Sequence, residues 1–213
     1  MAKMKCPEEI AAHLVEISKG FYLRGWVSGT SGNFSAVVKR DPLVLAMSAS
    51  GADKEILSPE QILLIDDQCN VISERAAKPS AESPLHTRLA REFGTGAVLH
   101  THSVWSTTLS ELEAAKGGVA IEGYEMLKGL TNVQTHEHRE WLPIVENSQD
   151  MIALAEMVSR TLRNSPAAHG FLLRRHGLYT WGSDLDEAKR HVEILEFLLE
   201  ATGRLRMMKQ GEC

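Results

Sequence analysis

A short apolar run that ends in two histidines, residues 97–102 (AVLHTH), constrains this chain more than any other stretch. The run predicts a β-strand. Because side chains alternate faces along a strand, His100 and His102 are expected on the same side. Two imidazoles so placed can bind one metal ion, and a catalytic zinc site uses about three protein ligands with one position left open. The alternative is a pair of surface histidines on a half-exposed strand. The metal site therefore requires a third ligand from elsewhere in the chain.

A third candidate ligand, His176, follows another apolar segment. Residues 170–174 (GFLLR) predict a strand, and His176 lies just beyond it, next to Gly177. Glycine lets the backbone turn closely around a site. The alternative is a core or surface histidine, and the need for a third nitrogen ligand favours the site. We therefore expect His176 to complete the ligand set with His100 and His102.

A second His-x-His pair, His136 and His138, has a different setting. It lies in the charged segment 135–140 (THEHRE), and no apolar strand lies beneath it. This pattern indicates a solvated loop, so the sequence assigns no metal to it.

Two loops of small polar residues precede the metal strand. Residues 28–33 (SGTSGN) and 49–54 (ASGADK) can both present backbone N–H groups and hydroxyls to an anion. No Gly-Lys-Ser/Thr follows the first loop, so it is not a Walker loop, and it does not match a Rossmann fingerprint. Taken alone, a loop such as the first is more often just a turn.

The remaining patterns predict the fold. Apolar residues at helical spacing between Ile10 and Phe21 indicate a first helix, and residues 34–38 and 43–48 indicate paired strands. Helices and strands then alternate irregularly, up to a long C-terminal helix, without repeats or linkers. This predicts one domain, 1–213, of class α/β, with three α/β/α layers and a central mixed, largely antiparallel sheet.

Composition excludes several classes of partner. The net charge is −5, which gives no electrostatic case for nucleic acid or an anionic membrane surface. No apolar run is long enough to cross a bilayer, and residues 1–6 lack an apolar signal core. The three cysteines, Cys6, Cys69 and Cys213, are scattered, which suggests reduced thiols. A cytoplasmic location is expected.

Read together, five motifs resemble the successive signatures of the class II aldolase and epimerase superfamily over nearly the whole chain. They are Ser31-Gly32-Asn33, Ser50-Gly51, Pro79-Ser80-Ala81-Glu82, His100-Thr101-His102 and His176-Gly177.

The resemblance implies a metal, a substrate and an assembly. It implies one zinc ion per subunit on His100, His102 and His176, and a homotetramer with sites near the subunit boundaries. The substrate would be a small sugar phosphate. The residues implied to bind it and its phosphate are Ser31, Gly32, Asn33, Ser50, Gly51 and Ser80.

Within the superfamily, residues 125–129, 143–147 and 174–182 resemble the dehydratases that act on 5-methylthioribulose 1-phosphate in methionine salvage. This implies a lyase that works through a metal-stabilised enediolate. The acid/base of related aldolases matches Glu82, whereas that of the dehydratases matches Glu125. Both glutamates are present, and we predict that Glu125 is the acid/base and that Glu82 lines the substrate or metal side.

Two other functions stay open at this stage. One is a sister enzyme that uses the same chemistry, either a class II sugar-phosphate aldolase or a ribulose-phosphate 4-epimerase. The other is a non-catalytic interaction module of the same fold. The module would be expected to lack metal histidines, and all three are present.

Overall fold

The protein is described by a computed structural model that covers residues 7–74 and 77–210. Its helices and strands in chain order are α1 (Pro7–Leu23), β1 (Asn33–Arg40), β2 (Leu43–Ser48), η1 (Pro59–Gln61), β3 (Ile62–Asp66), α2 (Ser83–Glu92), β4 (Ala97–Thr101), α3 (Val104–Leu112), η2 (Ala114–Lys116), β5 (Gly118–Glu122), η3 (Glu125–Gly129), β6 (Arg139–Val145), α4 (Met151–Arg163), β7 (Gly170–Leu173), β8 (Gly177–Gly182) and α5 (Leu185–Gln210).

The eight strands form one sheet with the order β3-β2-β1-β4-β8-β7-β6-β5. Every neighbouring pair is antiparallel except β6 and β7, which run parallel. The prediction of a mixed, largely antiparallel sheet is confirmed.

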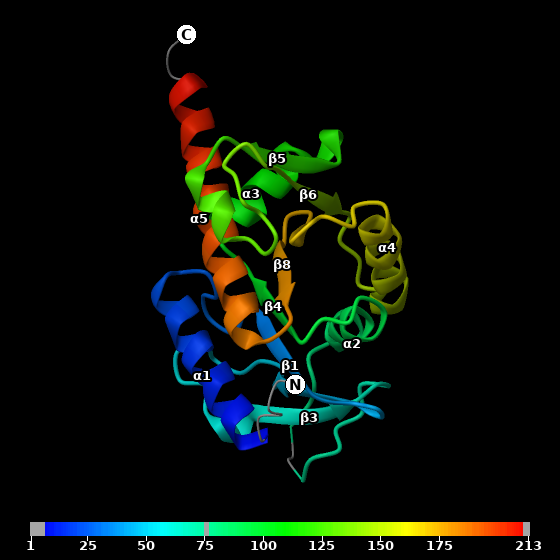
Figure 1. Cartoon of the computed structure of the whole chain (residues 1–213). Helices are drawn as coiled ribbons and strands as arrows, with labels where there is room; N and C mark the ends of the chain where they lie inside the picture. Colours follow the sequence, from blue (N-terminus) through cyan, green and yellow to red (C-terminus); the bar gives the residue numbers. More distant parts are fainter. Residues whose placement is uncertain (1–6, 75–76, 211–213) are drawn as a thin grey trace.

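Helices cover both faces of this sheet. In Figure 1, α1 and α5 lie on one side of the strands, and α2 and α4 lie on the other. Apolar side chains of α1 and of the start of α5 pack on β1, β2 and β3, while those of α2 and α4 pack on β4, β7 and β8. The middle of α5 packs with α3 over the β5–β6 end of the sheet. The three-layer α/β/α prediction is therefore confirmed.

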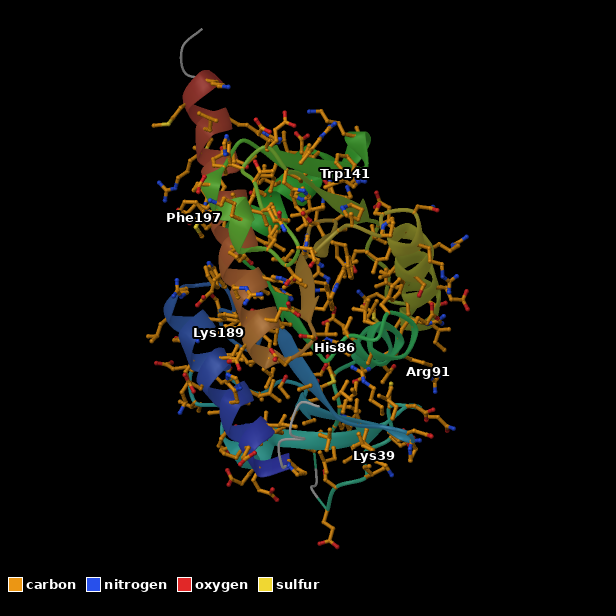
Figure 2. All side chains as sticks on the ribbon, in the orientation of Figure 1. Lys39, His86, Arg91, Trp141, Lys189 and Phe197 are labelled. Atoms are coloured by element: carbon orange, nitrogen blue, oxygen red, sulfur yellow. The ribbon has the colours of Figure 1, made fainter. Side chains whose placement is uncertain are left out.

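One local prediction holds only in part. The sequence predicts a solvated loop for residues 135–140, and residues 135–138 do lie in an irregular, largely exposed segment, but β6 begins at Arg139 and Glu140 is only 1% exposed. Antiparallel pairing with β5 covers this end of β6, and Trp141 packs closely on Gly118, where a Cβ atom would come within 2.3 Å of its ring. Figure 2 shows Trp141 at this edge of the molecule.

Some expectations concern residues that the structure does not describe. These are the missing signal core in residues 1–6 and the reduced thiols of Cys6 and Cys213. The third cysteine, Cys69, is described and is a free thiol. Within residues 7–74 and 77–210, no helix combines the length and the apolar character needed to span a membrane.

The centre of the sheet positions the candidate site. Strand β4 lies between β1 and β8, and its register sets His100 opposite Asn33 on one side and Tyr179 on the other. The turn between β7 and β8 returns the chain to the end of β4. A Cβ atom on Gly177 would lie 2.0 Å from the carbonyl oxygen of Thr101, so only glycine lets the two strands approach this closely.

Candidate active site

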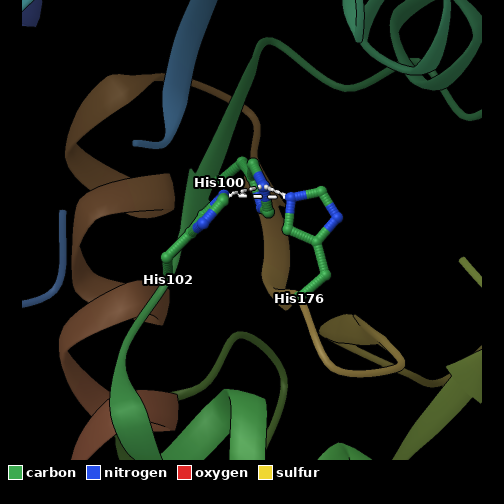
Figure 3. A group of neighbouring side chains, drawn as sticks. All are labelled: His100, His102 and His176. Atoms are coloured by element: carbon green, nitrogen blue, oxygen red, sulfur yellow. Dashed lines mark hydrogen bonds between the residues drawn. The ribbon is translucent and has the colours of Figure 1, made fainter. Parts of the chain in front are cut away.

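Three histidines converge at the end of β4. His100 lies on β4, His102 lies just beyond it, and His176 lies in the turn that leads into β8. Their Nε2 atoms are 2.7 Å apart for His100 and His102, 3.1 Å for His102 and His176, and 3.3 Å for His100 and His176. Figure 3 shows the three rings pointing at one another. The structure thus brings together the three ligands proposed from the sequence.

Hydrogen bonding fixes the proton on His100. Its Nδ1–H donates to the carbonyl oxygen of Leu178 at 2.9 Å, so the lone pair of a neutral ring is at Nε2. Burial holds the pKa of His100 well below its usual value and lowers the pKa of His102 to about 4. Burial also lowers the pKa of His176. Neutral rings direct their lone pairs at one point, which is the arrangement a divalent cation needs.

A carboxylate completes this arrangement. Glu82, at the start of α2, places Oε1 3.5 Å from His176 Nε2 and Oε2 3.7 Å from His100 Nε2. Oε1 is buried and accepts no hydrogen bond from the described residues. An uncompensated buried negative charge is costly, and a cation at the triad would compensate it. The donor set therefore fits a divalent metal ion.

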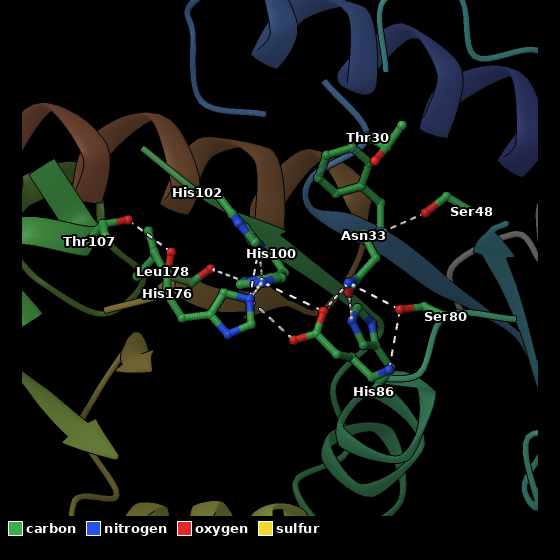
Figure 4. A network of polar contacts seen from close by, with 12 residues as sticks. Thr30, Asn33, Ser48, Ser80, His86, His100, His102, Thr107, His176 and Leu178 are labelled. Carbon is green, nitrogen blue, oxygen red and sulfur yellow. Dashed lines mark hydrogen bonds and ion pairs between the residues drawn. The ribbon is translucent and has the colours of Figure 1, made fainter. Parts of the chain in front are cut away.

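Glu82 is itself held by Asn33, which is held by His86. Asn33 Nδ2 donates to Glu82 Oε2 at 2.5 Å, so Asn33 Oδ1 is the oxygen that accepts from His86 Nε2–H, also at 2.5 Å. His86 Nδ1 then accepts the hydroxyl proton of Ser35 at 2.7 Å. Figure 4 shows His86 beneath Asn33. Burial lowers the pKa of His86 to about 3, so this ring stays neutral and the network keeps one orientation.

The two small polar loops meet beside the triad. They form the walls of a cavity of about 320 Å³, which contains all six residues predicted to bind substrate or phosphate. The lining is Thr30, Ser31, Gly32, Asn33, Ala49, Ser50, Gly51, Ser80, Glu82 and His102. Gly32 and Gly51 have φ of +72° and +69°, a conformation that glycine adopts without strain.

Lys54 lies behind this cavity and was missed by sequence reasoning. Its side chain is buried, and Nζ donates to the carbonyl oxygens of Ala52 at 2.7 Å and Thr30 at 3.4 Å, which ties the two loops together. Burial lowers the pKa of Lys54 to about 8. The available signal was a lysine as the last residue of the second loop, residues 49–54.

His86 was also missed. It lies on α2, a helix whose other buried residues include Leu85 and Leu89, and Figure 2 shows it inside the molecule. A single histidine in an amphipathic helix carries no signal of this role.

Glu125, the predicted acid/base, does not line the cavity beside the triad of its own chain. It is at the start of η3 with its side chain 73% exposed, and it forms an ion pair of 2.7 Å with Lys128. The Lys128 ammonium lowers the pKa of this carboxyl group. Among the described contacts of one chain, Glu82 and not Glu125 reaches the triad.

The chain is similar to known proteins over most of its length. The family described as the class II aldolase and adducin N-terminal domain matches residues 12–202. A methylthioribulose-1-phosphate dehydratase of Sorangium cellulosum is 41% identical over 192 residues, 90% of each chain. The enzyme of the same name from Pectobacterium atrosepticum is 44% identical over 188 residues, 87% of this chain and 89% of that one.

Solved structures share the fold. An L-fuculose 1-phosphate aldolase superposes with a TM-score of 0.77 at 19% identity, covering 94% of this chain and 87% of that one. YgbL of Escherichia coli, described as a putative aldolase/epimerase/decarboxylase, gives a TM-score of 0.74 at 25% identity, covering 93% and 90%.

Proposed function

This chain belongs to the class II aldolase and adducin N-terminal domain family, and we propose that it is a lyase that removes water from 5-methylthioribulose 1-phosphate. The product is 2,3-diketo-5-methylthiopentyl 1-phosphate, and the reaction is a step of methionine salvage. The observation that carries the proposal is the identity of about 40% over nine tenths of the chain to enzymes named for this activity.

The triad of His100, His102 and His176 binds a divalent cation, which we assign as zinc, one ion per subunit. Three neutral imidazoles beside a cavity are typical of zinc sites that keep a position open for substrate. When bound, the cation supplies a Lewis acid that stabilises negative charge developing on substrate oxygen atoms.

The cavity between the two loops binds the phosphate group. Ser31 Oγ is buried without a hydrogen-bond partner among the described residues, so it is available to a phosphate oxygen. Hydroxyls and N–H groups of the same loops supply further donors. Lys54 adds a positive charge behind them, and none of the described carboxylates forms an ion pair with it.

The reaction breaks the C3–H and C4–O bonds of the substrate. A carboxylate takes the proton from C3, and the electron pair left behind is delocalised onto the C2 carbonyl oxygen as an enediolate. When the C4 hydroxyl leaves, this pair forms the C3–C4 double bond and the C2 carbonyl is restored. The hydroxyl leaves as water once a general acid has protonated it. The resulting enol becomes the C3 ketone when C4 takes up a proton and the C3 hydroxyl gives one up. General acid/base catalysis of this kind contributes roughly 100- to 10,000-fold in rate.

We assign the acid/base role to Glu125, and we infer that Glu82 lines the substrate or metal side of the site. The exposed carboxylate of Glu125 is available to the site of a neighbouring subunit, whereas Glu82 faces the triad of its own chain and is fixed by Asn33.

A homotetramer fits this division of roles. Large apolar side chains are exposed on α3 and α5, among them Val104 at 69%, Leu112 at 58% and Phe197 at 49%. Figure 2 shows Phe197 on the outer side of α5. Subunit contacts would cover this surface.

The free thiol of Cys69 supports a cytoplasmic location.

The test is to incubate the zinc-loaded protein with 5-methylthioribulose 1-phosphate and identify the products. Trapping with an aromatic diamine would capture the expected 2,3-diketone. Dihydroxyacetone phosphate and methylthioacetaldehyde would instead show cleavage of the C3–C4 bond, and a substrate changed only at C4 would show epimerisation. Either outcome would replace the dehydratase by one of the sister activities.

A further inference from the structure

A second cluster of metal-binding groups lies at the other end of β7. His176 follows β7, whereas His169 directly precedes it. Strand β6 runs parallel to β7, so its first residues lie at the same end of the sheet as His169. There Glu140, at the start of β6, and His138, just before it, meet His169.

The three side chains share one oxygen atom. Glu140 Oε2 is 2.9 Å from His138 Nε2 and 2.9 Å from His169 Nδ1. The other oxygen, Oε1, accepts the backbone N–H of His169 at 2.9 Å, which fixes the carboxylate. The Glu140 side chain is fully buried, whereas those of His138 and His169 are 26% and 15% exposed.

The orientation of His169 matches that of a metal ligand. Its Nε2–H donates to the carbonyl oxygen of Thr131 at 2.8 Å, which directs Nδ1 at Glu140. Metal-binding histidines usually donate their second N–H in this way. His100 is held by the same device in the triad, where Nδ1–H donates to Leu178 and Nε2 faces the centre.

Counting protons shows what a cation would replace. Because a carbonyl oxygen only accepts, His169 must carry a proton at Nε2. The contact between His169 Nδ1 and Glu140 then needs a second proton, on the ring or on the carboxyl group. A divalent cation in that position would displace this proton and leave two neutral imidazoles and one carboxylate as ligands.

The cluster is open to solvent on one side. His138 and His169 line a cavity of about 520 Å³ together with Thr131, Glu187 and His191. Among the described residues, no lysine or arginine lines it, although Arg190 contacts Glu187 from outside at 3.5 Å. A cation can therefore enter, and a coordination position remains for water.

We propose that His138, Glu140 and His169 form a second transition-metal site, distinct from the histidine triad. Two imidazoles and one carboxylate with an open position suit Zn²⁺. The bound ion ties the start of β6 to the start of β7 and so stabilises the sheet at the end away from the triad.

The test counts zinc ions bound to the full chain. Metal-free protein is titrated with Zn²⁺ against a coloured chelator, and bound zinc is then measured by elemental analysis. Wild type should bind two ions per chain, His138→Gln one, and the matched control His136→Gln two. Loss of one of three ligands should weaken the second site by more than the roughly 10–100-fold that outer-shell partners contribute.

A second measurement leaves the cluster intact. His102→Gln removes a triad ligand, so added Zn²⁺ should still bind one ion per chain and raise the melting temperature. Saturation of the wild type at one ion, retention of two ions by His138→Gln, or an unchanged melting temperature of zinc-treated His102→Gln would each overturn the proposal.

Discussion

Glu82 Oε1 lies 3.5 Å from His176 Nε2, yet it accepts no hydrogen bond from any described residue. Three neutral imidazoles and the carboxylate of Glu82, which Asn33 holds at Oε2, thus surround a point that the buried Oε1 atom faces without a donor among the described residues. Glu82→Gln removes that charge and should weaken zinc binding about 10–100-fold, as loss of a residue next to the ligands usually does. Titration against a chelator measures this. Unchanged affinity would show that Glu82 does not act on the metal.

Glu125→Gln should bind zinc normally and lose most of its turnover, roughly 100- to 10,000-fold, because a general acid/base is removed. Glu122→Gln, which changes an exposed carboxylate on the neighbouring strand, is the matched control and should keep wild-type kcat. Near-normal activity of Glu125→Gln would transfer the acid/base role to Glu82.

Mixing two inactive variants tests whether Glu125 acts across a subunit boundary. Glu125→Gln and His102→Gln subunits, reassembled together, should regain part of the wild-type activity, since some sites would pair an intact triad with an intact Glu125. Mixtures that stay as inactive as the separate variants would refute the shared site.

Lys54→Met should raise KM for the phosphorylated substrate and weaken competitive inhibition by inorganic phosphate. The expected change is roughly 10- to 100-fold, since a hydrogen bond to a charged group contributes about 1.5–3 kcal/mol. The exposed Lys39→Met is the control. If the two variants had the same KM, Lys54 would have only a structural role.

The metal-free protein should lose stability as the pH falls below about 6.5. Burial lowers the pKa of His86 in the folded state to about 3, so between these values the unfolded chain binds more protons and unfolding becomes easier. His86 faces Asn33, Ser35 and the ring of Tyr179, and none of these carries a charge to offset the effect. His86→Gln should reduce the slope of unfolding free energy against pH, measured by denaturant titration. An unchanged slope would mean that other groups cause it.

The sequence was sufficient for the fold class because its main signals are local. The apolar spacing from Ile10 to Phe21 predicted α1. The AVLHTH run predicted β4, and the alternation of side chains along a strand placed both histidines on one side. His176 could be paired with them because it follows a second apolar strand and directly precedes Gly177.

Signals that depend on tertiary contacts could not be read in advance. The charged segment 135–140 resembles a loop, and Glu140 becomes buried only because β5 pairs with β6 and His169 supplies its partners. His86 and Lys54 acquire their roles from loops distant in the sequence. In the proposed shared site, the position of Glu125 relative to a neighbouring triad is set between subunits, which no pattern within one chain specifies.

The proposed dehydration depends on one metal ion bound by three imidazoles. The most direct test compares diketone formation from 5-methylthioribulose 1-phosphate by the chelator-stripped protein before and after one equivalent of Zn²⁺, with His102→Gln alongside. We expect turnover to be absent in the stripped protein, restored by zinc in the wild type, and not restored in His102→Gln. Equal turnover in all of these samples would contradict a reaction that requires a metal ion at the triad.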